Sequence, residues 1–335
     1  MQKFTPYEYV LIAIANSNGL DKVTWNERIE WSENLIKLPF REQLDFARTE
    51  CKGEPILMAK AINAHNDIVR GRETGFMANL DATASGIQVM SALTGCHASA
   101  SKVNLIDNGK RNDLYNDVAT DMNTNHGTNV SRKDLKLPIM TTFYGSNAMP
   151  KILFGDGTPE LAAFVNAMQK GLKGAYQLLL DMQSLQSPSA SVYKWTLPDG
   201  HTAYVPVMEA VDKKVEIAEL NKATFTFRTK VNQPKDFDLS LPANIVHSID
   251  AYVVRQLYRR ASIRGYDLTT IHDSFWTHPN NMEDVRIGYA DELANLASSN
   301  VIQNIMNEVG NLNGVYHKYS NDLPELIRKS NYALS

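Results

Sequence analysis

The segment from Met77 to Ala92 constrains the fold of this chain more than any other part of the sequence. An apolar run from Phe76 to Leu80 leads to a single carboxylate, Asp81, followed first by small residues and then by apolar residues at helical spacing. This order predicts a buried strand, a tight turn and the start of a helix. A carboxylate at a strand end can hold a metal ion beside a phosphate, and small residues let a substrate approach closely. Taken alone, such a residue caps a helix at least as often as it binds a metal ion.

The composition indicates a globular protein and excludes several classes of function. The 335 residues are enough for one large or two ordinary domains, and 43% of them are hydrophobic. No apolar run has membrane-spanning length, so no membrane partner is expected. Two cysteines, Cys51 and Cys96, predict no disulfide framework. The formal net charge of −3 lacks the overall basicity of a nucleic-acid-binding protein, so such binding needs locally clustered cations or charge from another chain.

Helices dominate the predicted secondary structure, and strands are expected in three regions. Helices are predicted over 5–17, after the capping residue Thr24, over 41–69 with a break at 53–55, and over 113–122, 131–145 and 159–186. A further helix is predicted from Pro242 to just before Gly265, and the region that follows the strands around His272-Asp273 is predicted to be helical up to Gly310. Strands are predicted before Asp81, in hairpins at 195–204 and 215–231, and on either side of His272-Asp273. Residues 121–130 and the tail after Gly310 have irregular patterns. Because there is no internal repeat or clear linker, the chain is predicted to be one α+β unit.

The predicted helix over 131–145 has a distinctive chemical face. Four side chains recur at four-residue steps and therefore share one face: Arg132, Lys136, Met140 and Tyr144. That face carries two cations, a thioether and a phenol. Pro138 interrupts the pattern because it lacks a backbone donor, and it is expected to bend the helix or to delay its start.

These elements complement one another chemically. Asp81 and Asp273 each stand at the end of a predicted strand, and two carboxylates held close can bridge two Mg²⁺ ions about 4 Å apart, as in-line phosphoryl transfer requires. Arg132 and Lys136 can neutralise a triphosphate. The Tyr144 hydroxyl, two turns beyond Lys136, can sense a ribose 2′-OH. The combination predicts a nucleotidyl transferase that holds a nucleoside triphosphate on a helix and its phosphates on two metal ions.

Each feature has a simpler interpretation when it is taken alone. Asp81 can be a helix cap, and His272-Asp273 can be an ordinary turn. The two cations of the 131–145 helix can belong to a solvated face, and His247 can be a core histidine with a satisfied hydrogen bond. Eight histidines and two cysteines show no zinc-site spacing, and no Gly-x-x-x-x-Gly-Lys loop is present, which excludes a P-loop NTPase.

Taken together, the motifs resemble those of the single-subunit RNA polymerases of bacteriophages and mitochondria. The segment Asp81-Ala-Thr-Ala-Ser-Gly-Ile-Gln-Val-Met-Ser-Ala92 is similar to motif A of that family. Arg132-x3-Lys136-x3-Met140-x3-Tyr144-Gly145 is similar to motif B, and Ile271-His-Asp-Ser-Phe275 is similar to motif C. Further matches are Asn244-x-Val246-His247-Ser248-x-Asp250 and segments at 19–29, 103–115, 196–200 and 330–334. The matches run in order from near residue 16 to the end of the chain.

The resemblance implies a mostly helical right-hand polymerase with palm and fingers, a small antiparallel palm sheet and a β-hairpin specificity loop near 213–233. The whole chain would be one catalytic unit, with 1–110 and 240–335 mainly palm, 111–190 mainly fingers, and 191–240 the β-hairpins. The implied activity is that of a DNA-directed RNA polymerase. Such an enzyme transfers nucleotides from rNTPs to the RNA 3′-OH on a DNA template and releases pyrophosphate.

The resemblance also implies roles for individual residues. Asp81 and Asp273, with the carbonyl of Ala82, would bind two Mg²⁺ ions, and Lys136 would assist the leaving pyrophosphate as a third catalytic group. The incoming nucleotide would be contacted by Lys22, Arg132, Lys136, Met140, Tyr144 and His272, and Tyr144 would select ribonucleotides. The nucleic acid would be contacted by Gly86, Tyr115, Gly145 and His247. The C-terminal carboxylate would lie near the site.

The sequence departs from the family pattern in ways that affect its expected partners. Ala82 replaces the usual glycine. Leu137 stands where the phage enzymes often have a second basic residue, so fewer cationic side chains would contact the triphosphate. The family's N-terminal domain, with its Gly-Arg motif, has no counterpart before residue 16. Since some phages split this polymerase into two polypeptides, we expect a catalytic subunit with a second, smaller subunit, an accessory DNA-binding factor and a location in the cytoplasm of an infected bacterium.

Two other functions remain as alternatives. A related right-hand DNA polymerase shares the Arg-x3-Lys…Tyr-Gly helix, but it usually has His-Asp-Glu where this chain has His272-Asp273-Ser274. A catalytically inactive subunit that binds DNA or a partner would not need the metal and triphosphate residues, all of which are present.

Overall fold

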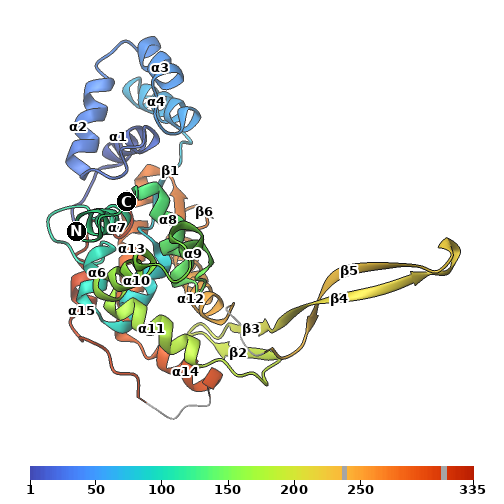
Figure 1. Ribbon diagram of the computed structural model, residues 1–335. Coiled ribbons are helices and arrows are strands. Elements are labelled where there is room, and N and C mark those ends of the chain that lie inside the picture. The colour runs from blue at the N-terminus through green and yellow to red at the C-terminus, as the bar shows by residue number, and fades with distance from the viewer. Residues whose placement is uncertain (236–239, 311–314) are drawn as a thin grey trace.

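The computed structural model describes residues 1–235, 240–310 and 315–335, and the fold is of the predicted α+β class (Figure 1). Helices surround a three-stranded antiparallel sheet with the order β1 (Ala78–Asp81), β7 (Ser274–Thr277) and β6 (Leu268–Ile271). This sheet joins strands that are far apart in the sequence, and its strands are those predicted before Asp81 and around His272-Asp273. No helix among the described residues is long and apolar enough to cross a membrane.

Four helices precede the sheet and form the end of the molecule at the top of Figure 1: α1 (Pro6–Ser17), α2 (Trp25–Leu35), α3 (Phe40–Thr49) and α4 (Pro55–Val69). The predicted capping box of Thr24 and Glu27 starts α2, and a second one at Thr5 and Glu8 starts α1. The predicted break at 53–55 separates α3 from α4. α1 is buried along most of its length, where it packs against α2, α4 and α13 (Pro279–Ser298).

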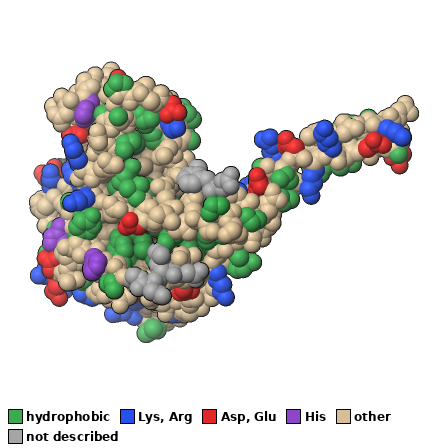
Figure 2. All heavy atoms as spheres, turned by 60° about the horizontal axis from the view of Figure 1, so that its bottom comes forward, with side chains coloured by type: hydrophobic (Ala, Val, Ile, Leu, Met, Phe, Trp, Pro, Cys, Tyr) green, Lys and Arg blue, Asp and Glu red, His purple; other side chains and the backbone are tan. Residues whose placement is uncertain are grey.

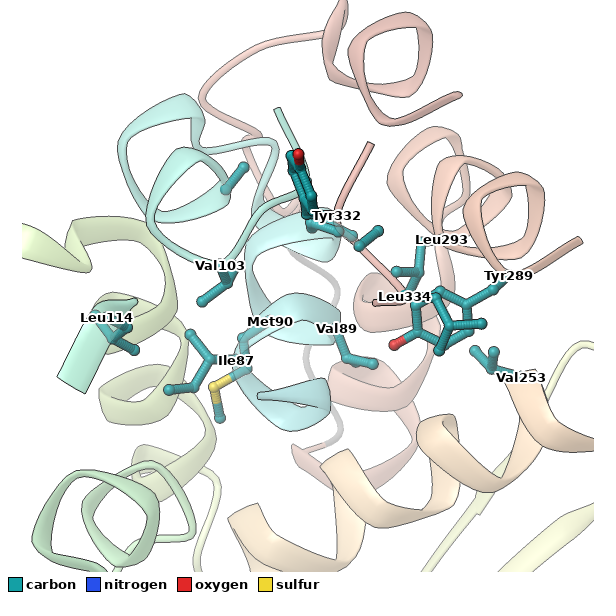
Figure 3. Packing of buried hydrophobic residues seen from close by; sticks show 14 of the residues in the cluster. Ile87, Val89, Met90, Val103, Leu114, Val253, Tyr289, Leu293, Tyr332 and Leu334 are labelled. Carbon is teal, nitrogen blue, oxygen red and sulfur yellow. The ribbon is translucent and has the colours of Figure 1, made fainter. Parts of the chain in front are cut away.

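α5 (Ser85–Thr94) is the centre of the core, because every one of its residues is buried. It contacts α6 (His97–Lys102), α11 (Lys173–Ser184), α12 (Ser240–Arg264) and α13. Figure 3 shows Met90 and Val89 of this helix between Leu114 on one side and Tyr289 on the other. The segment from Met77 to Ala92 therefore supplies both the strand that ends at Asp81 and the helix on which the core is assembled.

The prediction of one helix over 159–186 is wrong. The structure has two helices, α10 (Pro159–Gly171) and α11, which meet at Leu172, whose φ of −124° and ψ of 42° are not helical. The break lies where two distant segments pack together. A Cβ atom at Gly174 would lie 2.2 Å from the Cβ atom of Cys96, so the backbone of the first turn of α11 packs directly on the Cys96 side chain, and the N–H of Gly174 donates to the Ser99 hydroxyl at 3.1 Å.

Three other expectations need correction. α7 (Leu114–His126) continues into the segment expected to be irregular and ends at Gly127, whose φ of 65° suits a helix C-cap. α8 (Arg132–Phe143) does not start late at Pro138, because Ser131 and Asp134 form a capping box at its first turn. The tail contains a helix, α15 (Leu323–Arg328). The remaining helices are α9 (Ala148–Phe154) and α14 (Val301–Gly310).

Both predicted hairpins are present. The first, β2 (Val192–Thr196) and β3 (Thr202–Pro206), is fixed to α12 because Arg255 donates to the two Oδ atoms of Asp199 at 2.6 and 3.2 Å. The second, β4 (Met208–Ile217) and β5 (Ala223–Asn232), is longer than predicted and has the short η1 helix (Ala218–Leu220) before its tip. It is the arm on the right of Figures 1 and 2, with charged and apolar side chains along its length. Asn221 and Lys222 form the tip, as predicted.

Candidate functional site

The adjacent ends of β1 and β7 bring two acidic residues together. Asp81 is the last residue of β1 and is paired with Ser274, the first residue of β7. The N–H of Ala82 donates to the Asp273 carbonyl at 3.0 Å. His272 and Asp273 form the turn between β6 and β7, in which His272 has a φ of 56°. Backbone pairing therefore fixes Asp81, Ala82 and Asp273 at one edge of the sheet.

The environment of Asp273 disfavours its negative charge. Burial raises the pKa of its carboxyl, and the neighbouring Asp81 raises it further, while His272 and Lys136 act in the opposite direction. No group of three or more His, Cys, Asp or Glu side chains is arranged to hold a metal ion in the part of the chain that the structure describes. Two carboxylates still fit Mg²⁺, because this ion keeps several waters and is usually bound by one or two carboxylates plus substrate phosphates.

A cavity of about 280 Å³ lies beside these carboxylates, and most of the site residues predicted from the sequence line it. Ten of them line it: Lys22, Asp81, Ala82, Gly86, Tyr115, Arg132, Lys136, Met140, Tyr144 and Asp273. Three others do not line it, although each adjoins a lining residue. The ring of His247 lies 4.7 Å from that of Tyr144, while His272 and Gly145 are sequence neighbours of Asp273 and Tyr144.

A buried arginine holds the loop from which Lys22 enters the cavity. Arg28 is fully buried, and it donates to the carbonyls on both sides of Lys22, those of Asp21 at 2.8 Å and Val23 at 3.1 Å. Its guanidinium lies 4.3 Å from the centre of the Trp25 ring. Arg28 therefore fixes the backbone that presents Lys22, a role that the sequence did not indicate.

Tyr144 follows α8 and packs its ring on the start of α5. Gly86 makes this possible, because a Cβ atom there would lie 3.0 Å from the Tyr144 hydroxyl oxygen. Burial and the negative charges of Asp250 and Asp273 raise the pKa of Tyr144 to about 12. The hydroxyl therefore stays protonated and can donate a hydrogen bond into the cavity.

A third carboxylate, Asp250 on α12, belongs to the same electrostatic environment, although the sequence assigned it no role. The Ser85 hydroxyl donates to its Oδ2 at 3.4 Å. Burial and the charge of Asp273 raise the pKa of Asp250 to about 6. The fold therefore keeps a carboxyl group that is costly to ionise next to the strand-end pair.

Asp250→Asn is expected to stabilise the protein at neutral pH. Because the pKa of Asp250 is raised from 3.8 to about 6, the folded state binds the proton more tightly than the unfolded state, and stability falls as the pH rises through this window. The amide does not titrate, so the variant should be more stable by on the order of 2 kcal/mol at about pH 7.5, and equal to the wild type below about pH 4. Urea unfolding in EDTA at both pH values measures the difference. Equal stability at neutral pH would contradict the account.

Residues 333–335 pass over the loop that follows β1. Ala82 and Leu334 form an isolated antiparallel bridge, and the N–H of Ser335 donates to the Asp81 carbonyl at 2.9 Å. Ser335 consequently lines the cavity, in agreement with the expectation that the tail lies near the site.

Several lining residues were not predicted as site residues: Asp21, Arg111, Asn112 and Asp113. Asp113 accepts a hydrogen bond from Arg132 Nε at 2.6 Å and caps α7. Arg111 lies in the irregular segment between α6 and α7, where neither periodicity nor spacing marks a residue as functional. Only its position two residues before Asp113, within a segment that resembles the family, could have indicated it.

A carboxylate pair and a cationic helix that line one cavity are chemically suited to a phosphorylated ligand and a divalent cation. Residues 5–152 and 162–331 match the family described as DNA-dependent RNA polymerase. The chain therefore belongs to the DNA-dependent RNA polymerase family, which confirms the resemblance inferred from the motifs.

Similar proteins include organellar polymerases. Mitochondrial DNA-directed RNA polymerase 1 of Nicotiana sylvestris is 21% identical over 359 residues, which cover 89% of this chain and 35% of the relative. The human mitochondrial DNA-directed RNA polymerase is 21% identical over 266 residues, covering 67% of this chain and 21% of the relative. A probable DNA-directed RNA polymerase of Neurospora crassa is 31% identical over 159 residues, covering 40% of this chain and 17% of the relative. The chain thus spans about a third of the length of the first of these relatives.

Proposed function

We propose that this chain carries the catalytic site of a DNA-directed RNA polymerase. It transfers a nucleotide from a ribonucleoside triphosphate to the 3′-OH of RNA under the direction of a DNA template, and pyrophosphate leaves. The observation that supports this most strongly is that Asp81 and Asp273 line the same cavity as Lys22, Arg132 and Lys136. Family membership and the names of the relatives support the same reaction.

Asp81 and Asp273, with the Ala82 carbonyl, are the proposed ligands of two Mg²⁺ ions. Bound there, the ions would stabilise both the attacking and the leaving oxygen of an in-line displacement. The chain's own contribution is a rigid frame, because the ladder of β1 and β7 and the Ala82-to-Asp273 hydrogen bond hold the ligands in place before substrate binds. The raised pKa of Asp273 supports the assignment, since a cation between the carboxylates would relieve their repulsion.

Three cations are proposed to hold the triphosphate. Arg132 is oriented by Asp113, and Lys22 is presented by the loop that Arg28 fixes. Lys136 interacts electrostatically with Asp273, which supports its assignment to the reacting phosphate. There it neutralises the leaving pyrophosphate and can donate a proton to it. Met140 lines the nucleotide site, and His272 supports Asp273 from the adjoining turn position.

Tyr144 is proposed to recognise the ribose, and four neighbours to contact the nucleic acid. Its protonated hydroxyl can hydrogen-bond a 2′-OH, which a deoxynucleotide lacks. The proposed nucleic-acid contacts are Gly86, Tyr115, Gly145 and His247. Gly86 and Tyr115 line the cavity with Tyr144, and His247 covers the Tyr144 ring, which supports their grouping.

Replacing Gly86 by Ala is expected to displace the Tyr144 hydroxyl, because the added methyl group would meet it at 3.0 Å. A shift of this kind should slow ribonucleotide addition by about 10- to 100-fold and weaken discrimination against dNTPs. Single-turnover addition of one nucleotide to an RNA primer measures both effects. Gly171→Ala is a matched control, because a Cβ atom at Gly171 meets no atom within 4 Å. If the Gly86 variant kept the wild-type rate and selectivity, Gly86 would have no such role.

The architecture is proposed to be that of a right-hand polymerase. In this scheme 1–110 and 240–335 form mainly the palm, 111–190 mainly the fingers, and the arm made by β4 and β5 is the promoter-reading specificity loop. The small sheet that carries Asp81 at its edge and the cationic helix α8 opposite it support the palm and fingers assignments. The projection of the β4–β5 arm from the body supports its assignment to DNA contact (Figure 1).

The principal alternative is a right-hand DNA polymerase. Incorporation assays that compare each rNTP with its dNTP on a primed DNA template separate the two functions. A ribonucleotide preference is expected, because Ser274 stands in place of the glutamate of His-Asp-Glu and Tyr144 is placed to sense the sugar. A wild-type preference for dNTPs would favour the alternative.

We further propose a second, smaller subunit, an accessory DNA-binding factor and action in the cytoplasm of an infected bacterial cell. The net charge of −3 supports a partner, because a nucleic-acid channel needs more positive charge than this chain supplies. Purification of the tagged chain from infected cells should recover a small companion that restores activity to the isolated chain. Efficient extension on long templates by the chain alone would contradict the need for a partner.

A further inference from the structure

The cavity contains more positive charge than the proposed phosphate contacts account for. Four cationic side chains line it: Lys22, Arg111, Arg132 and Lys136. Lys22 is paired with Asp21, and Arg132 with Asp113. Within residues 1–235, 240–310 and 315–335, Arg111 forms no ion pair with a carboxylate, and the roles proposed above do not include it.

Neutral acceptors hold Arg111 at the cavity wall. Its Nε donates to the Ser335 hydroxyl at 3.3 Å, and its Nη1 donates to the Asn112 carbonyl at 3.3 Å. A guanidinium has five N–H donors, so these two bonds leave donors available for a ligand. The planar group also matches the spacing of phosphate oxygens and can bind two of them at once.

The surroundings of Arg111 favour an anion. Burial and the charge of Arg132 lower the pKa of Arg111, while Asp21 and Asp113 act in the opposite direction. Burial and the charges of Arg111 and Arg132 likewise lower the pKa of Lys22, against the effect of Asp21. Three cations thus repel one another across the cavity, and a polyanion between them would turn this repulsion into attraction.

We propose that Arg111 binds the distal phosphates of the incoming ribonucleoside triphosphate, together with Lys22 and Arg132. This assignment rests on the proposed function of the cavity. The distal phosphates are favoured because Arg111 interacts with Lys22 and Arg132 among the cations that line the cavity, whereas Lys136 is the cation beside Asp273. The phage enzymes often have a second basic residue at the position that Leu137 occupies here. Arg111, which comes from another segment, would supply the missing positive charge.

A purely structural role for Arg111 would have different consequences. Arg111 contacts Ser335, and the N–H of Ser335 donates to the Asp81 carbonyl. If Arg111 served only to hold Ser335, its loss would disturb the whole cavity and weaken monophosphate and triphosphate binding alike. A contact with the distal phosphates affects the triphosphate alone.

The test is equilibrium binding of fluorescent GTP and fluorescent GMP to the full chain with Mg²⁺ and without a primer, so that no reaction occurs. Arg111→Met should weaken GTP binding by about 10- to 100-fold, the range expected for a hydrogen bond to a charged group, and leave GMP binding unchanged. Arg111→Lys, which keeps the charge without the planar fork, should fall between Arg111→Met and the wild type. Lys110→Met is the matched control, because Lys110 is an exposed cation next in sequence and should have no effect.

Each outcome decides between the interpretations. Unchanged affinities for both GTP and GMP in the two Arg111 variants would overturn the proposal for Arg111 and leave the proposed function intact. Equal weakening of both ligands would also overturn it, in favour of the structural role. If the wild type bound GTP no more tightly than GMP, the proposed function of the cavity would fail together with the assignment of Arg111. Thermal unfolding of each variant excludes loss of fold as the cause.

Discussion

Asp273→Asn is expected to lower the rate of nucleotide addition by about 10³-fold or more, with little loss of stability. Asp273 is a proposed ligand of the catalytic ions, so its loss should forfeit several kcal/mol of transition-state stabilisation, and each 1.36 kcal/mol is about a tenfold change in rate. Stability should be kept or raised, because the pKa of Asp273 is raised by burial and by Asp81, and an amide carries no charge to repel. Asp81→Asn should have a similar effect on the rate. Single-turnover nucleotide addition and thermal unfolding of the same preparations measure the two quantities.

Asp267→Asn is the matched control for these variants. Asp267 is an exposed carboxylate next to β6 of the same sheet, and it does not line the cavity. Its replacement should change the rate by less than about twofold, as for most surface substitutions. If Asp81→Asn and Asp273→Asn kept wild-type activity in the assembled enzyme, the chain would not supply the catalytic metal ligands.

Tyr144→Phe is expected to lower the preference for rNTPs over dNTPs by about tenfold or more, with a smaller effect on ribonucleotide addition itself. The variant keeps the ring, which packs on Gly86 and His247, and removes only the hydroxyl. That hydroxyl remains protonated near neutral pH and is proposed to bond the 2′-OH, a contact of about 1 kcal/mol or more. The ratio of kcat/KM for each rNTP and its dNTP measures the effect.

Tyr176→Phe provides a control on a neighbouring tyrosine. Its ring packs edge-to-face on Phe143 of α8, but it does not line the cavity. Loss of a hydroxyl there should leave sugar selectivity unchanged. Wild-type selectivity in Tyr144→Phe would show that another group recognises the ribose.

Local sequence signals predicted the elements that carry the proposed site. The Thr24 capping box, the strand that ends at Asp81 and the turn at His272-Asp273 each depend on residues within a few positions of one another. The four-residue spacing of Arg132, Lys136, Met140 and Tyr144 likewise placed all four on the cavity. Such features follow from helix and strand geometry, so a single sequence suffices to find them.

The features that were missed depend on contacts between distant segments. The break at Leu172 lies beside a close contact of Gly174 with Cys96, which comes from a distant segment. The position of Arg111 in the cavity depends on its contact with Ser335, which the tail brings to the loop after β1. Asp250 acquires its raised pKa only because α12 packs against α5 and buries the carboxyl group near Asp273, although the hydrogen bond from Ser85 acts in the opposite direction. Neither periodicity nor spacing in one sequence reports these long-range contacts.

The most direct test of the central claim is template-directed addition of a single ribonucleotide. The enzyme, with any companion subunit that purifies with it, is mixed with an RNA primer annealed to DNA templates that differ only in the next base, and each of the four rNTPs is supplied with Mg²⁺. If the chain carries the proposed polymerase site, the complementary rNTP should extend the primer on each template, and no extension should occur when EDTA removes the metal. Extension that ignores the template base, or extension that persists in EDTA, would contradict this claim.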